Sequence, residues 1–135
     1  MKIGIILSCY NIEDKINLST IMDVINTNGH LHFCFVNNGS SDNTMNILEY
    51  LSRESGQDIS VLDLKKKKTS NAVAKVGSRY LNTKEEIDYV QSVLIDFTMN
   101  QFQVEKALKA QVLKEHEFYE NDTYKFRLKR IRELK

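Results

Sequence analysis

The chain has 135 residues and a formal net charge of +1, with 41% hydrophobic and 27% charged residues. These values fit one globular domain with a single core, and so small a charge gives no general attraction to nucleic acid, which we do not expect as a partner. No apolar run reaches the roughly 20 residues that a membrane-spanning helix needs. The two cysteines, Cys9 and Cys34, fall in or beside apolar segments, and as buried thiols they predict a cytoplasmic protein.

The start of the chain reads as strand, helix and strand. The apolar run IGIILS at 3–8 is typical of a strand covered on both faces of a parallel sheet. The polar segment CYNIEDK follows, and a helical spacing of isoleucines then continues to Asn28-Gly29, a pair that ends helices. A second strand, LHFCFVN, is expected at 31–37.

A second helix and a third strand follow the segment NGSSDNT. The helix is expected at about 43–55, with Asp42 or Ser41 as its N-cap and Gly56 as its end. The sequence ISVLDL at 59–64 then predicts the third strand.

A third helix and a fourth strand complete the alternation. Ser70 is expected to cap a helix that runs to Leu81, and Asn82 or Thr83 a short helical turn after it. The fourth strand is expected at 91–96, where the sequence is QSVLID.

Four alternations of strand and helix predict an α/β fold, a mostly parallel sheet with helices on both faces. Ligands of such sheets bind beyond the carboxyl ends of the strands. Three polar clusters fall at those ends, at 8–11, 37–42 and 96–100, and four lysines follow the third strand at 65–68. We therefore expect Ser8, Asn37 and Asp96 at one edge of the sheet.

The sequence changes character after residue 100, so we divide the chain into a domain at 1–100 and a C-terminal helical extension at 101–135. Two amphipathic helices are expected, at 101–120 and 123–135, and the second carries six Lys or Arg and one Glu. Three roles remain open for this extension: packing on the sheet, joining a second chain or a partner subunit, and peripheral contact with anionic lipid. The apolar stripes contain Val104, Ala107, Leu108, Val112, Tyr124, Leu128 and Ile131, and the basic face contains Lys125, Arg127, Lys129, Arg130 and Arg132.

The polar clusters have two readings, ordinary turns or a ligand site. The segments IGIILSCYNIE and FVNNGSSDNTMNIL favour the second, because they resemble the first two motifs of family 2 glycosyltransferases. The likeness covers about residues 1–100 and implies the nucleotide-binding half of a GT-A fold, Rossmann-like and short or degenerate in this chain. In that family the first loop and the acid of the second motif hold the base and ribose of a nucleotide-sugar.

By position, this resemblance assigns nucleotide binding to both loops. The first loop contributes Cys9, Tyr10, Asn11 and Glu13, and the second contributes Asn38, Gly39 and Ser40. Asn38 stands where the family has aspartate, and its amide still offers a donor and an acceptor to a base.

A third resemblance, in KKKKTSNAVAKVGSRYL, is looser. Lys75 and Gly77 fall in place, but Thr69 and Asn71 replace the family's early glycines. The lysines are either solvated after the strand or attract a diphosphate through Lys67, Lys68 or Lys75.

The fourth family motif is reduced. Asp96-Phe97-Thr98 stands where the family has Asp-x-Asp, which holds a divalent cation on the sugar diphosphate. Asp96 is therefore either a structural residue or a single carboxylate for Mg²⁺ or Mn²⁺ that needs the ligand's phosphates. The histidines His30, His32 and His116 have no metal-binding spacing.

The resemblance predicts a glycosyltransferase-like protein that binds a nucleoside-diphosphate sugar. If active, it would transfer a hexosyl group to an acceptor, but no general base is identified, since charged helices replace the half that carries it in the family. The chain is then a fragment or a short relative, weak or inactive alone, which a partner subunit could complete. The alternative is a non-catalytic interaction or dimerisation module derived from the same fold.

Overall fold

A four-stranded parallel sheet forms the centre of the molecule, which a computed structural model describes over residues 2–112. Its strands are β1 (Ile3–Cys9), β2 (Leu31–Asn38), β3 (Ser60–Leu64) and β4 (Tyr89–Ser92), in the order β3-β2-β1-β4. The register pairs Cys9 with Asn37, so the polar ends of β1 and β2 lie side by side. The predicted α/β class and the parallel sheet are confirmed.

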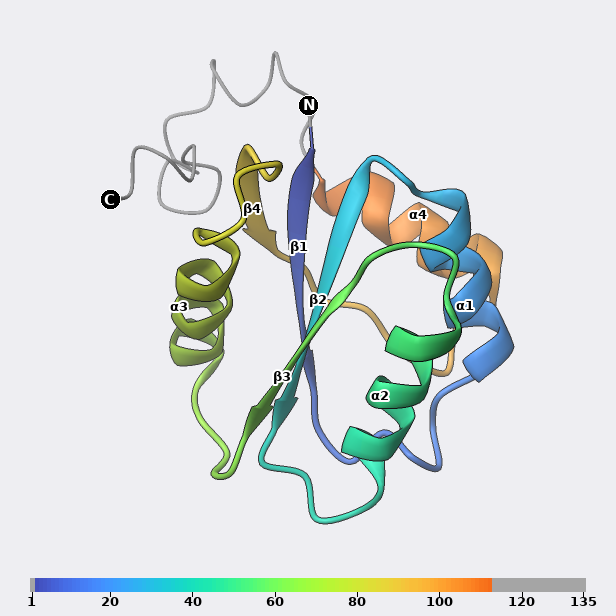
Figure 1. Cartoon of the computed structure of the whole chain (residues 1–135). Helices are drawn as coiled ribbons and strands as arrows, with labels where there is room; N and C mark the ends of the chain where they lie inside the picture. The colour runs from blue at the N-terminus through green and yellow to red at the C-terminus, as the bar shows by residue number, and fades with distance from the viewer. Residues whose placement is uncertain (1, 113–135) are drawn as a thin grey trace.

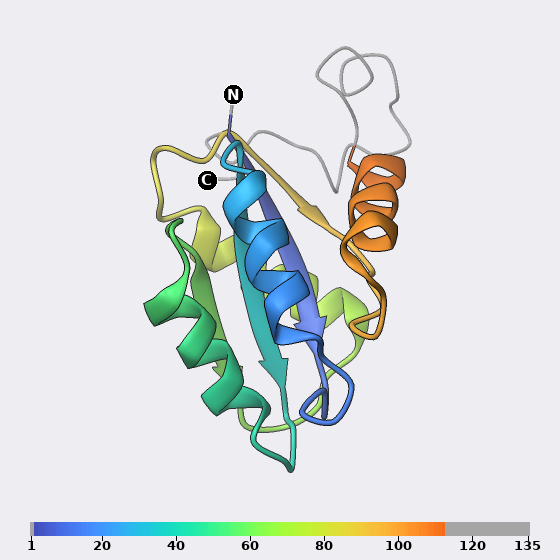
Figure 2. The same ribbon diagram turned by 90° about the vertical axis from the view of Figure 1, so that its right-hand side faces the viewer.

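Helices cover both faces of the sheet, as Figures 1 and 2 show. The helices are α1 (Leu18–Thr27), α2 (Thr44–Glu54), α3 (Ser70–Leu81) and α4 (Gln101–Gln111). On one face, α1, α2 and α4 enclose the larger core around Phe33 and Phe35. On the other face, α3 is the one helix of residues 2–112 that packs against Ile6 and Val36.

Helices α2, α3 and α4 begin within one residue of their predicted starts. Asn43 occupies the N-cap position of α2, so the expected caps Asp42 and Ser41 are wrong. Asp42 still serves this end, since its Oδ1 accepts the N–H of Thr44 at 2.9 Å. The cap of α3 is Thr69, not Ser70, and its side chain accepts the N–H of Ala72.

Strand β4 ends earlier in the sequence than predicted, at Ser92 and not at residue 96. Val93 still donates its N–H to the carbonyl of Ile6, but Leu94 bonds to the side chain of Gln111 instead of a neighbouring strand. Leu94 is 75% exposed as a result. The short helical turn expected after Leu81 is also wrong, because Asn82 is the C-cap of α3 and only turns follow.

Helix α4 ends at Gln111, so it is shorter than the helix predicted for 101–120. Val104 and Leu108 are buried in the same core as Ile21 and Ile25 of α1. The predicted helix at 123–135, its basic face and His116 lie outside the described residues. Within residues 2–112, every helix is too short or too polar to cross a lipid bilayer.

Candidate functional site

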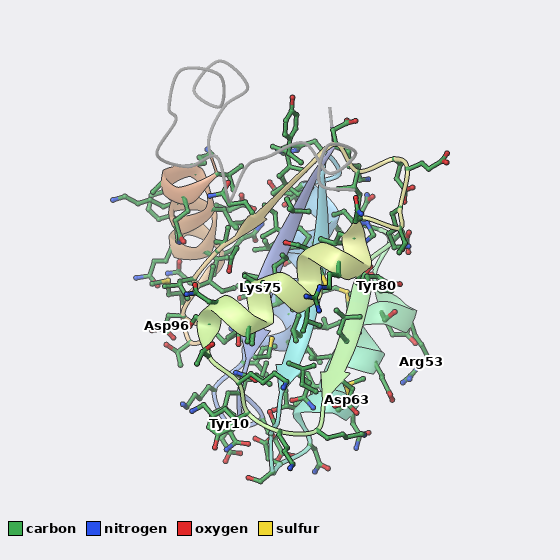
Figure 3. The ribbon with its side chains drawn as sticks, turned by 90° about the vertical axis from the view of Figure 1, so that its left-hand side faces the viewer. Tyr10, Arg53, Asp63, Lys75, Tyr80 and Asp96 are labelled. Atoms are coloured by element: carbon green, nitrogen blue, oxygen red, sulfur yellow. The ribbon has the colours of Figure 1, made fainter. Side chains whose placement is uncertain are left out.

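The loops that follow β1, β2 and β3 meet at the carboxyl edge of the sheet. Figure 3 labels Tyr10 after β1 and Asp63 near the end of β3, both at this edge. The segment after β4 also reaches the first loop, because Asn17 donates its N–H to the carbonyl of Phe97 at 3.2 Å. Segments from the ends of all four strands thus lie toward the same edge of the sheet.

The first two loops are joined by hydrogen bonds from backbone to side chain. Asn11 donates its N–H to Ser40 Oγ at 2.9 Å, and its own Oδ1 accepts the N–H of Ser41 at 2.8 Å. Asn11 has a φ of 48°, in the left-handed region that asparagine tolerates better than most residues. Ile12 adds a third bond, to Thr44 Oγ1 at 2.9 Å. The two loops therefore form one ordered unit.

Glu13 and Asp42 extend this unit. Asp42 Oδ2 accepts the N–H of Glu13 at 3.2 Å, while Glu13 Oε2 accepts from Asn43 Nδ2 at 3.0 Å. Desolvation alone would raise the pKa of Asp42, but the hydrogen bonds from Thr44 and Glu13 outweigh it and hold that pKa below its usual value. Both carboxylates thus contribute to loop structure.

The two asparagines that end β2 are buried and bonded within the protein. Asn37 Nδ2 donates to Asp63 Oδ1 at 2.8 Å. Asn38 Oδ1 accepts the N–H of Lys68 at 2.8 Å, and Asn38 Nδ2 donates to the carbonyl of Lys68 at 3.0 Å. Asn37 therefore ties the end of β2 to β3, and Asn38 ties it to the loop that follows β3.

Gly39 brings the second and third loops into direct contact. It has a φ of +68°, and a Cβ at this position would lie 2.3 Å from the backbone nitrogen of Lys67. Its N–H donates to the carbonyl of Leu64 at 3.0 Å. Only glycine combines this backbone conformation with so close an approach.

The lysine loop, residues 65–68, carries the positive charge of this edge. Lys65 forms an ion pair with Asp63 at 2.7 Å, and its hydrogen bond, with that of Asn37, lowers the pKa of Asp63. Lys67 Nζ lies 3.9 Å from the centroid of the Tyr10 ring, and Tyr10 as a residue is 42% exposed. No carboxylate within residues 2–112 forms an ion pair with Lys66, Lys67 or Lys68, so their charge is available to an anion.

Cys9 and Lys75 lie differently from the other candidates. The side chain of Cys9 is fully buried in the core, and burial raises the pKa of its thiol. It therefore offers only its backbone to the first loop. Lys75 is exposed on α3, and Figure 3 shows it above the edge that carries Tyr10.

Asp96 is an exposed carboxylate in the loop between β4 and α4. Its Oδ1 accepts from Thr98 Oγ1 at 2.7 Å and from the Thr98 N–H at 2.9 Å. These bonds, and the charge of Lys15, lower the pKa of Asp96. No group of three or more His, Cys, Asp or Glu in residues 2–112 could hold a metal alone, so a cation here would need oxygen ligands from a bound phosphate.

A cleft of about 260 Å³ between α3 and β4 was not predicted from the sequence. Within the described residues, the buried Oε1 of Gln91 has no hydrogen-bond partner. Its side-chain nitrogen donates to the carbonyl of Gln111, where α4 ends. The lining has no charged side chain and consists of Ile6, Ser70, Asn71, Ala74, Ser78, Gln91, Ser92, Leu94 and Gln111.

Comparisons with known proteins identify the fold. No protein-family model and no curated protein sequence matches the chain. Solved structures of Staphylococcus aureus TarS are similar: TarS 1-349 in complex with UDP-GlcNAc has a TM-score of 0.51 at 20% identity, over 81% of this chain and 30% of that one. The structure of TarS 1-349 alone has a TM-score of 0.51 at 18% identity, over 81% of this chain and 32% of that one. A further TarS structure has a TM-score of 0.50 at 20% identity, over 81% of this chain and 19% of that one.

This likeness concerns the fold. TarS is a glycosyltransferase, so the chain has a glycosyltransferase-like fold. It spans less than a third of the length of each of these TarS chains.

Proposed function

We propose that the chain is a nucleotide-sugar-binding domain of the family 2 glycosyltransferase type, with a GT-A fold. It binds a nucleoside-diphosphate sugar at the carboxyl edge of the sheet. The observation that carries this proposal is the contact of Lys67 with the partly exposed Tyr10, because it joins an aromatic surface to lysines that form no ion pair within residues 2–112. The similar fold of TarS in complex with UDP-GlcNAc supports it.

Tyr10 is the residue suited to the base. Its ring is partly exposed and stands on a loop that the bonds of Asn11 to Ser40 and Ser41 hold in place. A flat nucleobase stacks on such a ring, and the stack orients the rest of the nucleotide. Lys67 now lies over this ring, so it must move aside or cover the outer face of the base.

The lysine loop is suited to the diphosphate. Ammonium groups attract phosphate oxygens as compact charges, and three of the four lysines form no ion pair within the described residues. Lys75 adds a further charge from α3. A Mg²⁺ or Mn²⁺ held by Asp96 and the diphosphate would neutralise charge on the leaving group.

Sugar transfer would break the bond between the anomeric carbon and the diphosphate and form one to an acceptor hydroxyl. The hydroxyl proton needs a base within hydrogen-bond reach, and we assign none of the described residues to this role. We therefore propose that the chain binds the nucleotide-sugar but transfers sugar weakly or not at all alone.

The alternative function is a non-catalytic interaction module on the same fold. One observation favours it: Phe102, on the first turn of α4, is 75% exposed. A large exposed apolar side chain of this kind is suited to a protein contact.

Calorimetric titration with UDP, GDP and ADP, with and without Mn²⁺, tests the proposed function. Tyr10→Ala should weaken binding of the best ligand about tenfold, since stacking on an aromatic ring contributes about 1–3 kcal/mol per base. Tyr50→Ala is the matched control, because Tyr50 is also 42% exposed but lies on α2. Absence of binding at millimolar ligand would favour the interaction module.

A further inference from the structure

Both polar atoms of the Asn38 side chain are bonded to one backbone unit. The Oδ1 accepts the N–H of Lys68 at 2.8 Å, and the Nδ2 donates to the carbonyl of the same residue at 3.0 Å. The opposite orientation of the amide would place two donors together and two acceptors together, so these partners fix it. Asn38 is only 5% exposed, and its amide is held as a strand residue is held by a neighbouring strand.

This pairing is one of several contacts that hold the lysine loop against the end of β2. Gly39 donates its N–H to the carbonyl of Leu64, just before the loop begins. A Cβ on Gly39 would also lie 2.7 Å from the carbonyl carbon of Lys66. Asn38 closes the other end of the loop at Lys68. The lysine backbone is thus fixed at both ends, with the ammonium of Lys67 over Tyr10.

An aspartate could not form the same pairing. An ionised carboxylate accepts hydrogen bonds but donates none, so it could take the N–H of Lys68 but would face the carbonyl of Lys68 with a second acceptor. An amide is therefore the side chain that this loop geometry requires. The asparagine at position 38, where family 2 glycosyltransferases commonly have aspartate, has a structural reason in the lysine loop.

We propose that Asn38 is a positioning residue, which holds the lysine loop in place for the diphosphate and does not read the nucleobase. This inference rests on the proposed function. Its consequence is that replacing Asn38 weakens a ligand without a base as much as a complete nucleotide. A residue that reads the base would have no effect on the ligand without one.

The test compares UDP with inorganic pyrophosphate, both with Mn²⁺, by calorimetric titration. Asn38→Ala removes both bonds to Lys68, and Asn38→Asp removes the donated one. We expect Asn38→Ala to weaken the binding of both ligands at least about fivefold and by the same factor, because the two hydrogen bonds that position the lysine loop are lost. Asn38→Asp should also weaken the binding of both ligands by one common factor, because one of these bonds is lost. The control is Asn26→Ala, which removes a bond of 2.7 Å to the N–H of Gly56, between the end of α1 and the segment after α2. It should change neither affinity.

Amide hydrogen exchange of the ligand-free protein gives a second readout. The N–H of Lys68 should be protected in the unaltered chain and lose protection in Asn38→Ala, while the amides of β1 keep theirs. Unchanged protection at Lys68 would overturn the proposal whatever the ligands do.

The binding results separate the two proposals. Weaker binding of UDP with unchanged binding of pyrophosphate in the Asn38 variants would show that Asn38 reads the base. Lost protection at Lys68 without weaker binding of either ligand would show that Asn38 is a structural residue only. If the unaltered chain binds neither ligand, the proposed function fails, and the ligand role of Asn38 fails with it.

Discussion

Lys67 Nζ lies 3.9 Å from the centre of the Tyr10 ring, and this contact joins the loop after β3 to the loop after β1. A cation within about 6 Å of an aromatic face is attracted to the ring electrons. The contact brings together a flat apolar surface and a positive charge. A nucleoside diphosphate has the complementary pair, a flat base and an anionic group.

The first prediction concerns the charge of Lys67. Lys67→Gln should weaken UDP binding about fivefold at low ionic strength, and the difference should shrink as salt is added, because exposed charges are screened within about 10 Å at 0.1 M. Titrations at several salt concentrations measure this. Lys109→Gln on α4 has the same change in net charge and should leave affinity unaltered. Equal effects of the two variants would mean that only overall charge matters.

The second prediction concerns Gly39. Gly39→Ala places a Cβ 2.3 Å from the Lys67 nitrogen at a φ of +68°. The left-handed conformation alone costs an alanine roughly 1 kcal/mol, and the close contact must add to it or displace the lysine loop. We expect a free energy of unfolding lower by roughly 2 kcal/mol in urea titrations, a size usual for substitutions that force strain.

The matched control for Gly39 is Gly29→Ala. Its φ lies outside the left-handed region, and a Cβ there would lie 3.6 Å from the nearest atom of Gln57, an ordinary contact. It should leave stability within about 0.5 kcal/mol of the unaltered chain, as surface substitutions do. A similar loss in both variants would contradict the strain at Gly39.

The fold could be predicted because its signals are local. Runs such as IGIILS and LHFCFVN show strands of a parallel sheet, and the helix that ends at Leu81 was predicted to within one residue of its start, although its cap is Thr69 and not Ser70. The end of β4 could not be predicted, since the sequence QSVLID stays apolar past Ser92. The strand ends where the side chain of Gln111, from α4, forms hydrogen bonds with both the N–H and the carbonyl of Leu94. That partner lies 17 residues away in sequence.

The candidate site shows the same limit. The motif order placed Asn11, Asn38 and Ser40 at one edge, and the structure brings Asn11 and Ser40 into contact. The motif order could not reveal that the amide of Asn38 bonds to Lys68, because that partner is 30 residues distant in the sequence. Nor could it reveal the contact of Lys67 with Tyr10, since a run of lysines usually indicates a solvated loop.

The third prediction concerns pH and His32. Its Nε2 lies 2.7 Å from Ser60 Oγ, the residue is 1% exposed, and burial lowers its pKa below the usual 6.5. As the pH falls below 6.5, the unfolded chain takes up a proton that the folded chain does not. The free energy of unfolding should therefore fall, by at most about 1.4 kcal/mol per pH unit for this one group.

Urea unfolding between pH 7.5 and 5 measures this slope. His32→Gln should make the slope smaller, whatever its effect on stability at neutral pH. His30→Gln is the control, because it also replaces one histidine, but an exposed one just before β2. An unchanged slope in His32→Gln would assign the pH dependence to other groups.

The last prediction concerns Asp96 and the divalent cation. The hydrogen bonds from Thr98 lower the pKa of Asp96, so its carboxylate is charged at neutral pH, and no hydrogen bond within residues 2–112 occupies its Oδ2, which a cation could use. Because a single carboxylate holds Mg²⁺ or Mn²⁺ only together with phosphate oxygens, the cation and UDP should strengthen each other's binding. We expect Mn²⁺ to raise UDP affinity about tenfold in the unaltered chain and not in Asp96→Asn, which keeps the size of the side chain but loses its charge. Asp23→Asn, on the exposed side of α1, should keep the full effect of Mn²⁺. Titrations of UDP at fixed Mn²⁺ decide the matter: an equal gain in Asp96→Asn would leave Asp96 a structural residue that only fixes the turn to Thr98.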